Sequence, residues 1–321
     1  MKVLNGKISG GYSFKKFKGL PSPKLVVPEL PGHLSVPLTA FDTGVKPLVS
    51  SGDNVRAGQI ICQDDESISS PVHSPVNGVV DSVKKMDYLG TQINVVKIES
   101  GKSDSWETVP GYSKKWSELK KTELEKVIYL SGTSSLGKGG IPTSYNSSVI
   151  EPSEVRHILI KAVDAELYNP DISLFLQDEG AAHFSEGLSI LFKIMDQADF
   201  RIVIGSNSSN WFQVLDNSLA DDLPVTYHRV KPLYPQNNDL VLLKTVLDMD
   251  LPSGYTGINK GVVVLSIQDV CHIYDAVVHG KPLIERVIAL GGTGFTDRPH
   301  LLLKIGTAVS DIVDGKLSSD D

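Results

Sequence analysis

Thiols are scarce in this chain. Only Cys62 and Cys271 occur among its 321 residues. An iron–sulfur cluster held by a single chain needs about four thiolates, so the sequence cannot ligate one alone. A disulfide framework is excluded on the same count, and two isolated thiols favour a reducing compartment. The eight histidines show no HExxH spacing. Adjacent Cys271 and His272 would point to different faces of a helix, so we expect no metal site.

Positive charge and long apolar runs are also missing. Lysine and arginine number 31 against 38 acidic residues, which gives a formal net charge of −7. Nucleic acid is therefore not an expected partner. The short basic cluster at 15–18 is either a solvated turn or a contact with an anionic membrane or partner. The longest apolar runs, such as 261–267, fall well short of the roughly twenty residues that span a bilayer. Residues 1–20 lack the apolar core of a signal peptide. Any membrane association must then come through a partner.

The pattern of predicted secondary structure changes along the chain. Short β-type runs with glycine turns occupy 46–62, 70–85 and 91–100, and indicate a small all-β unit. From Ser117 onward, helical and strand patterns alternate, which is typical of a parallel sheet covered on both faces. The predicted strands are 155–163, 201–206, 225–230 and 261–266, and the predicted helices between and after them are 183–197, 211–222, 238–249 and 268–280. Beyond Pro282, two strands and a short helix form a unit that looks incomplete.

The stretch LGKGGIPT, at 136–143, is the clearest candidate for a binding loop. A glycine-rich turn before a helix lets backbone N–H groups approach a phosphate, helped by the positive end of the helix dipole. A single G-x-G-G run is a weak indication of this, however. The competing interpretation is a strand-to-helix turn with no ligand.

Several stretches in a fixed order resemble one family, that of the C subunit of the Rnf electron-transport complex (RnfC) and the A subunit of the sodium-translocating NADH:quinone reductase (NqrA). The resemblance covers about residues 25–315. The stretches that carry it are SGDNVRAGQI (51–60), SPVHSPVNGVV (70–80), LGKGGIPT (136–143), LPSG (251–254) and IYDAVVHGKPLIERVIALGG (273–292).

The resemblance implies an α/β fold built from several domains. The expected parts are an extended arm (1–30), a biotinyl/lipoyl-like barrel-sandwich hybrid (31–100), a linker (101–116), a Rossmann-like parallel-sheet domain related to the flavin subunit of NADH dehydrogenases (117–280) and a partial soluble-ligand-binding β-grasp (SLBB) unit (281–321). RnfC proteins continue into a ferredoxin-like domain with CxxCxxCxxxCP runs, and this sequence has no counterpart. The hairpin at 62–74 contains no lysine, so we expect neither lipoyl nor biotin.

The resemblance also names a candidate site for FMN or NADH. Its residues would be Gly137, Lys138, Gly139, Gly140, Thr143, Asp164 and Glu166. The motif shows several departures from the family pattern. Lys138 replaces a glycine, and the family's NAAECEP becomes KAVDAEL at 161–167, which keeps both carboxylates. The family's YPxGG loses both glycines at 234–238. No catalytic residue and no metal ligand is predicted.

Three functional hypotheses follow. The first is a peripheral subunit of a membrane NADH-driven electron-transport complex of Rnf or Nqr type. It would be attached to the cytoplasmic face of the membrane through partner subunits. Its work would be docking, and it would help shape a quinone or nucleotide pocket, without catalysis by the chain alone. The second is an FMN-binding component that oxidises NADH and passes electrons to a partner. The third is a stand-alone module that binds a soluble ligand. None of these hypotheses assigns an iron–sulfur cluster to this chain, since two thiols are too few to hold one.

Overall fold

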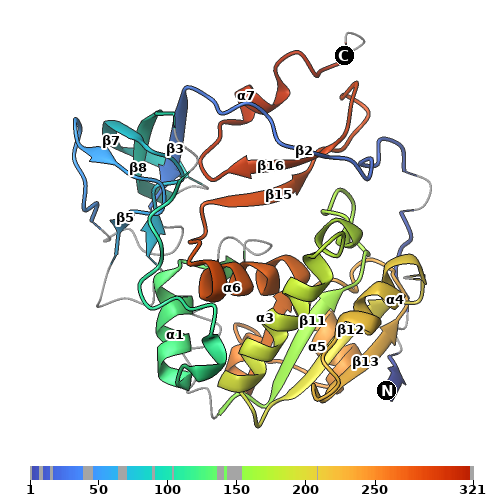
Figure 1. The fold of residues 1–321 in the computed structure, drawn as a ribbon. Helices are drawn as coiled ribbons and strands as arrows, with labels where there is room; N and C mark the ends of the chain where they lie inside the picture. The colour runs from blue at the N-terminus through green and yellow to red at the C-terminus, as the bar shows by residue number, and fades with distance from the viewer. Residues whose placement is uncertain are drawn as a thin grey trace. The chain divides into compact units, whose positions relative to one another are not determined.

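A computed structural model describes residues 2–6, 10–14, 17–38, 46–63, 71–88, 91–102, 105–135, 141–142, 154–207 and 209–318. The chain divides into two compact units, each discontinuous in sequence (Figure 1). Unit 1 comprises Met1–Leu20 and Asn146–Tyr274, and unit 2 comprises Pro21–Tyr145 and Asp275–Asp321.

Unit 1 is built on a five-stranded sheet in which every pair is parallel. In spatial order the strands are β1 (Lys2–Asn5), β13 (Val225–Val230), β12 (Asp199–Gly205), β11 (His157–Ala162) and β14 (Val262–Ser266). β11 and β14 are buried along nearly their whole length, as expected of a parallel sheet covered on both faces. β1 comes from the segment predicted as an extended arm and pairs with β13.

Four of the helices among the described residues cover this sheet. They are α3 (Gly180–Ile194), α4 (Ser209–Ser218), α5 (Asp239–Leu247) and α6 (Ile267–His279), whose last residues belong to unit 2. Figure 1 shows α3 and α6 in front of the sheet and α5 behind it. The chain leaves β11 towards β12 and β13 and then returns to β14 on the other side. Right-handed crossovers in opposite directions along the sheet must place their helices on opposite faces.

Alternating side chains of β11 serve the two faces. Leu159 is completely buried and packs with Val203, Leu242 and Val246 in one core cluster under α5. On the other face α3 and α6 lie close together at Gly187 and Val270. A Cβ on Gly187 would lie only 2.6 Å from the carbonyl oxygen of Val270, so the close packing requires glycine there. His183 of α3 stacks on Tyr274 of α6 with ring centroids 4.3 Å apart.

Unit 2 contains an antiparallel sheet and a short hairpin that together form a sandwich. The four strands, in spatial order, are β3 (His33–Pro37), β8 (Thr91–Ser100), β7 (Gly78–Tyr88) and β4 (Asn54–Val55), and the hairpin joins β5 (Ile60–Cys62) to β6 (Val72–His73). Leu34, Val36, Ile61 and Val96 are fully buried in its core.

A second sheet of unit 2 forms near the C-terminus. β15 (Glu285–Ala289) pairs antiparallel with β16 (His300–Lys304), and β16 pairs parallel with β2 (Leu25–Val26). The sequence pattern predicted only two strands for the C-terminal unit beyond Pro282. β2, from the N-terminal part of the chain, is its third strand. The remaining elements are α1 (Lys121–Leu130), α7 (Val309–Val313), the short pair β9 (Ser134–Ser135) and β10 (Ile141–Pro142), and 3-10 turns at Trp116–Glu118, Ile172–Phe175 and Gly257–Lys260.

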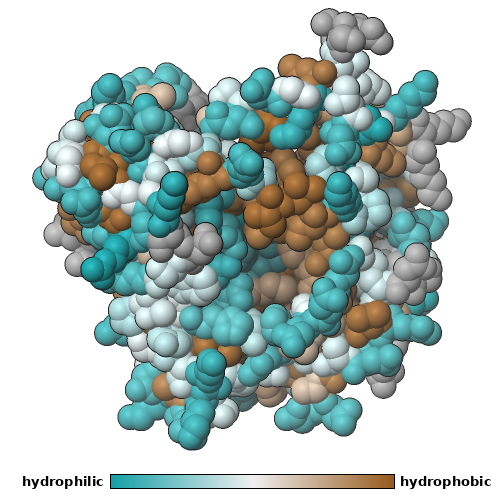
Figure 2. Space-filling view, turned by 45° about the horizontal axis from the view of Figure 1, so that its top comes forward, coloured by the Kyte–Doolittle hydropathy of each residue, from teal (hydrophilic) through white to brown (hydrophobic). Residues whose placement is uncertain are grey.

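The predicted fold class is confirmed: an α/β chain with an N-terminal antiparallel sandwich and a five-stranded parallel sheet with helices. The domain boundaries predicted from sequence remain proposals. Within the part of the chain that the structure describes, no helix has both the length and the apolar character needed to cross a bilayer. Figure 2 shows hydrophobic residues gathered on one face among more hydrophilic neighbours.

Candidate functional site: a charged cluster at the carboxyl ends of the strands

The strand order of unit 1 reverses between β11 and β14. In open α/β sheets, ligands bind outside the carboxyl ends of the strands where the order reverses. A candidate site is therefore formed by the end of β11, the loop that follows it, the start of α6 after β14 and the first turn of α5. These segments supply Lys161, Glu166, Asp239 and Asp269, which we call the switch-point cluster.

Lys161 is the centre of this cluster. It is the only charged residue after the first position of β11, and its side chain is 14% exposed. Its Nζ lies 3.3 Å from Oδ1 of Asp239, in the first turn of α5. Burial lowers the pKa of Lys161, and the nearby carboxylates of Asp269 and Glu166 partly oppose that shift. One ammonium therefore stands among three carboxylates.

Asp269 is held in place by the start of α6. Its Oδ2 accepts hydrogen bonds from the backbone N–H and the hydroxyl of Ser266, both at 2.8 Å. The Ser266 hydroxyl oxygen in turn accepts from the backbone N–H of Asp269 at 3.2 Å. This reciprocal pattern is a capping box. It keeps a carboxylate that is 1% exposed beside Lys161.

The two acidic residues predicted from sequence lie in the loop after β11, and their surroundings differ. Asp164 is exposed, and its pKa is raised by partial desolvation and by the neighbouring Asp171. Glu166 is half-buried, and its Oε2 accepts a hydrogen bond from Nδ2 of Asn169 at 3.1 Å. Of this pair, only Glu166 is among the charges that act on Lys161.

The other predicted site residues, Gly137, Lys138, Gly139, Gly140 and Thr143, lie outside the described residues. Only Ile141 and Pro142 of the LGKGGIPT stretch are described, as the short strand β10. The candidate loop therefore remains a prediction.

Sequence reasoning missed Lys161, Asp239 and Asp269 as members of one cluster. A signal existed for the first, because a lysine within the strand sequence HILIKA has aliphatic neighbours on nearly every side. A buried lysine needs a partner, so such a position predicts a nearby carboxylate. The serine and aspartate three residues apart at 266 and 269 also signal a capping box. Which carboxylate meets Lys161 depends on the crossover that brings α5 back across the sheet.

The side chains of the switch-point cluster do not fit a phosphate group. A phosphate needs a site with net positive charge, and the one ammonium here is outnumbered by three carboxylates. Three carboxylates would repel the phosphate of FMN. Carboxylates do accept hydrogen bonds from hydroxyl groups, so a ribose or ribityl chain remains chemically compatible. No group of three or more metal-ligating side chains occurs among the residues that the structure describes.

Comparisons with known proteins agree with this architecture. Residues 7–103 match the model of the RnfC barrel sandwich hybrid domain. The chain is 25% identical over 297 residues to the C subunit of the proton-translocating ferredoxin:NAD(+) oxidoreductase complex of Clostridium ljungdahlii, covering 92% of this chain and 63% of that protein. It is 23% identical over 335 residues to the Na(+)-translocating counterpart of Acetobacterium woodii, covering 100% of this chain and 73% of that protein. It is 26% identical over 272 residues to the C subunit of the ion-translocating oxidoreductase complex of Haemophilus influenzae strain PittEE, covering 83% of this chain and 41% of that protein.

A solved structure shares the fold alone. The crystal structure of an NAD+-reducing [NiFe]-hydrogenase in the H2-reduced state aligns with a TM-score of 0.52 at 12% identity, over 64% of this chain and 41% of that one. The fold and the sequence matches together define a relative of the C subunits of ion-translocating oxidoreductase complexes. Residues 7–103 thus match the RnfC barrel sandwich hybrid domain, and most of the chain is similar in sequence to RnfC proteins. It spans between 41% and 73% of the length of the relatives named above.

Proposed function

We propose that this chain is a peripheral, docking subunit of a membrane NADH-linked electron-transport complex of Rnf type, with a nucleotide site that has lost its phosphate-binding character. It would attach to the inner face of the cell membrane through the membrane subunits of that complex. The switch-point cluster is the observation that carries the proposal. The position where related folds bind a ligand is occupied by an internal ion pair between Lys161 and Asp239.

An exposed aromatic cluster of unit 1 supports the docking role. Tyr12, Phe17 and Tyr234 are 56%, 45% and 46% exposed. Phe14 joins them, with ring centroids 5.3 Å from Tyr12, 5.2 Å from Phe17 and 5.6 Å from Tyr234. Exposed aromatic side chains are over-represented among the residues that dominate protein interfaces. This aromatic cluster is therefore the surface of unit 1 that best fits a partner subunit.

Two measurements test the proposal together. First, the tagged chain is purified from gently solubilised native membranes, and the co-purifying proteins are identified by mass spectrometry. Recovery of membrane subunits of an Rnf- or Nqr-type complex is expected. Second, the purified chain is titrated with FMN while flavin fluorescence is followed. We expect no saturation up to about 100 μM, a concentration at which a functional flavin site would be filled.

The alternative function is an FMN-binding component that oxidises NADH and passes electrons to a partner subunit. The retained carboxylates of Asp164 and Glu166, in the loop directly after β11, favour this alternative, because they could accept hydrogen bonds from the hydroxyl groups of a nicotinamide ribose. Saturable FMN binding, with NADH-dependent reduction of an artificial acceptor that the Glu166→Gln variant weakens, would establish this alternative and overturn the proposal of a lost site. A matched control is Glu186→Gln, on α3. Quinone and NADH remain candidate ligands of the assembled complex.

A further inference from the structure

Unit 2 contains a cavity that the proposed function does not use. Its volume is about 490 Å³, within the range of small-molecule sites. Its walls are mainly apolar. Val76, Ile284, Leu301 and Ile312 line it and are each less than a tenth exposed. The lining comes from the sandwich, from β15 and β16, and from the segment after β2, so all of it lies within unit 2.

A partly buried ionic trio interrupts the apolar walls. Glu285 of β15 faces Lys304 directly across the β15–β16 pair, and Nζ of Lys304 donates to Oε2 at 2.7 Å. The other carboxylate oxygen, Oε1, accepts from Nζ of Lys281. The side chains of Lys281, Glu285 and Lys304 are 22%, 15% and 32% exposed. Two ammonium groups on one carboxylate leave one positive charge in excess. Each ammonium carries three N–H groups, so donors remain for a further acceptor.

Trp106 supplies an aromatic wall beside this trio. The Nζ of Lys281 lies 5.4 Å from the centroid of its ring. Backbone hydrogen bonds fix the segment that carries Trp106: Glu107 N–H donates to Ala57 at 2.7 Å and Val109 N–H to Gly280 at 2.8 Å. The backbone that carries the ring is therefore fixed before any ligand arrives, which lowers the entropic cost of binding.

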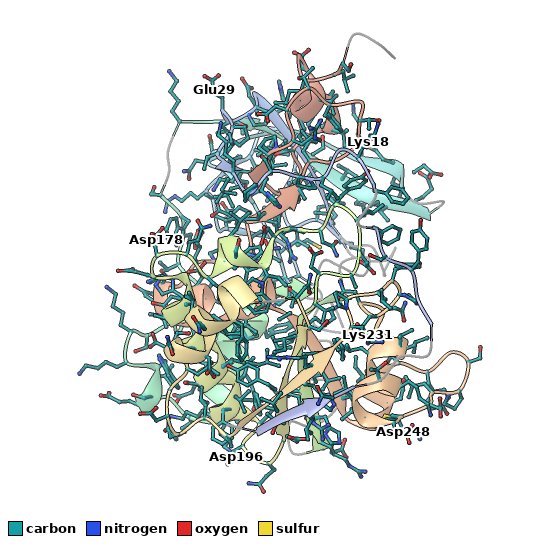
Figure 3. All side chains as sticks on the ribbon, turned by 90° about the vertical axis from the view of Figure 1, so that its right-hand side faces the viewer. Lys18, Glu29, Asp178, Asp196, Lys231 and Asp248 are labelled. Carbon is teal, nitrogen blue, oxygen red and sulfur yellow. The ribbon has the colours of Figure 1, made fainter. Side chains whose placement is uncertain are left out.

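The other acidic residues of the lining, which could cancel the excess positive charge of the trio, are exposed to solvent. Glu29 and Asp311 both line the cavity and are exposed, and Figure 3 shows the labelled Glu29 at the outer edge of the molecule. Lys316 directs its Nζ to the carbonyl oxygen of Ile312 at 2.6 Å. Water screens exposed charges more strongly than half-buried ones. The excess positive charge of the trio is thus the part that a bound molecule would experience.

We propose that this cavity binds a small organic anion with an apolar, preferably aromatic, body and one carboxylate. The body would pack against Trp106 and the aliphatic walls, and the carboxylate would accept hydrogen bonds from Lys281 and Lys304. This proposal does not depend on the electron-transport role, because none of these residues belongs to the switch-point cluster.

The test compares two molecules of nearly the same shape. 2-Naphthoate carries the carboxylate, and 2-naphthamide replaces it with a neutral amide. Isothermal titration calorimetry of the full chain should show one binding site for 2-naphthoate. The affinity for 2-naphthamide should be lower by a factor of at least about ten, since hydrogen bonds to a charged carboxylate are stronger than those to a neutral amide. Equal affinity for the two probes, or no binding of 2-naphthoate at about 5 mM, would overturn the proposal.

Variants of the trio sharpen the test by moving the affinity in opposite directions. Lys304→Met should weaken 2-naphthoate binding about tenfold and leave 2-naphthamide binding unchanged. Glu285→Gln removes the competing carboxylate and should strengthen 2-naphthoate binding. Lys244→Met, at an exposed ion pair of unit 1, is the matched control and should change neither affinity. If Lys304→Met does not fold, Glu285→Gln still decides, because unchanged or weaker binding in that variant contradicts the proposal.

Discussion

Lys161 on β11 and Asp239 on α5 form an ion pair across the carboxyl end of the unit 1 sheet, with 3.3 Å between Nζ and Oδ1. The pair joins β11 to the helix that lies on the return crossover from β13 to β14. Both partners are mostly shielded from solvent, at 14% and 25% exposure of their side chains. Loss of one charge would leave the others poorly compensated in a region with little water.

The first prediction concerns this pair. Lys161→Met should lower the free energy of unfolding by about 2 to 3 kcal/mol, because three neighbouring carboxylates lose their counter-ion. Urea denaturation followed by circular dichroism measures this loss. The double variant Lys161→Met/Asp239→Asn should recover part of the loss.

Lys244→Met is the control for this series, because Lys244 pairs with Asp248 and Asp250 at the exposed surface of unit 1. Figure 3 shows Asp248 near the edge of the molecule, and its side chain is 89% exposed. Exposed pairs contribute little to stability, so its urea midpoint should stay at the wild-type value. An equal midpoint shift in Lys161→Met and Lys244→Met would contradict the assigned role of Lys161.

A second prediction uses His73, which is 5% exposed in the sandwich of unit 2. Burial lowers the pKa of His73 from 6.5 to about 4, with a backbone hydrogen bond to Leu130 opposing the shift in part. Well above pH 6.5, His73 is neutral in both the folded and the unfolded state and contributes no pH dependence. As the pH falls from 6.5 towards 4, only the unfolded chain takes up the proton, so the folded state loses stability.

This loss should reach about 2 to 3 kcal/mol at pH 4 relative to pH 7, from about 1.4 kcal/mol per pKa unit. Thermal or urea unfolding across the pH range measures it. His73→Gln should lack this part of the slope, whereas His33→Gln, at an exposed position of β3, should keep it. The same acid sensitivity in wild type and His73→Gln would show that His73 is not the titrating group.

A third prediction tests how the segment with Trp106 is fixed. Gly58 has φ of +84°, and a Cβ there would lie 2.4 Å from the carbonyl oxygen of Glu107. Gly58→Ala should therefore cost about 2 kcal/mol or more and shift the near-ultraviolet circular dichroism of the tryptophans. Gly52 has a similar φ of +93° with nothing within 4 Å of a Cβ, so Gly52→Ala isolates the backbone strain. Equal destabilisation by the two variants would mean that the contact with Glu107 is unimportant.

A fourth prediction addresses docking through the aromatic cluster. The Tyr12→Ala/Tyr234→Ala double variant should reduce co-purification of membrane partner subunits at least tenfold, since truncation of two interface anchors commonly costs more than about 1 kcal/mol each. Tyr255→Ala is the matched control, because Tyr255 is 49% exposed in the same unit and lies outside the cluster. Thermal unfolding separates lost docking from lost folding. Full recovery of partners by the folded double variant would place the docking surface elsewhere.

Much of the fold was accessible from sequence because hydrophobic periodicity is local. The patterns at 225–230 and 261–266 predicted β13 and β14 to within a residue. The first is rich in β-branched and aromatic residues, and the second is the continuous apolar run typical of a buried parallel strand. The resemblance likewise led to the sandwich and to the acidic residues after β11. The thiol count alone predicted that these residues hold no iron–sulfur cluster by themselves.

Tertiary structure decided which distant residues meet. β1 and β2 each add a strand to a sheet whose other members lie more than 150 residues away, and pairing of that kind leaves no periodic mark in a segment rich in glycine and proline. Lys161 finds Asp239 only because the chain crosses back over the sheet after β13. The cavity beside Trp106 likewise needs walls from segments that are far apart in the sequence. Local sequence determines the propensity of each segment, but the enclosure of space and the pairing of buried charges arise only when those segments pack together.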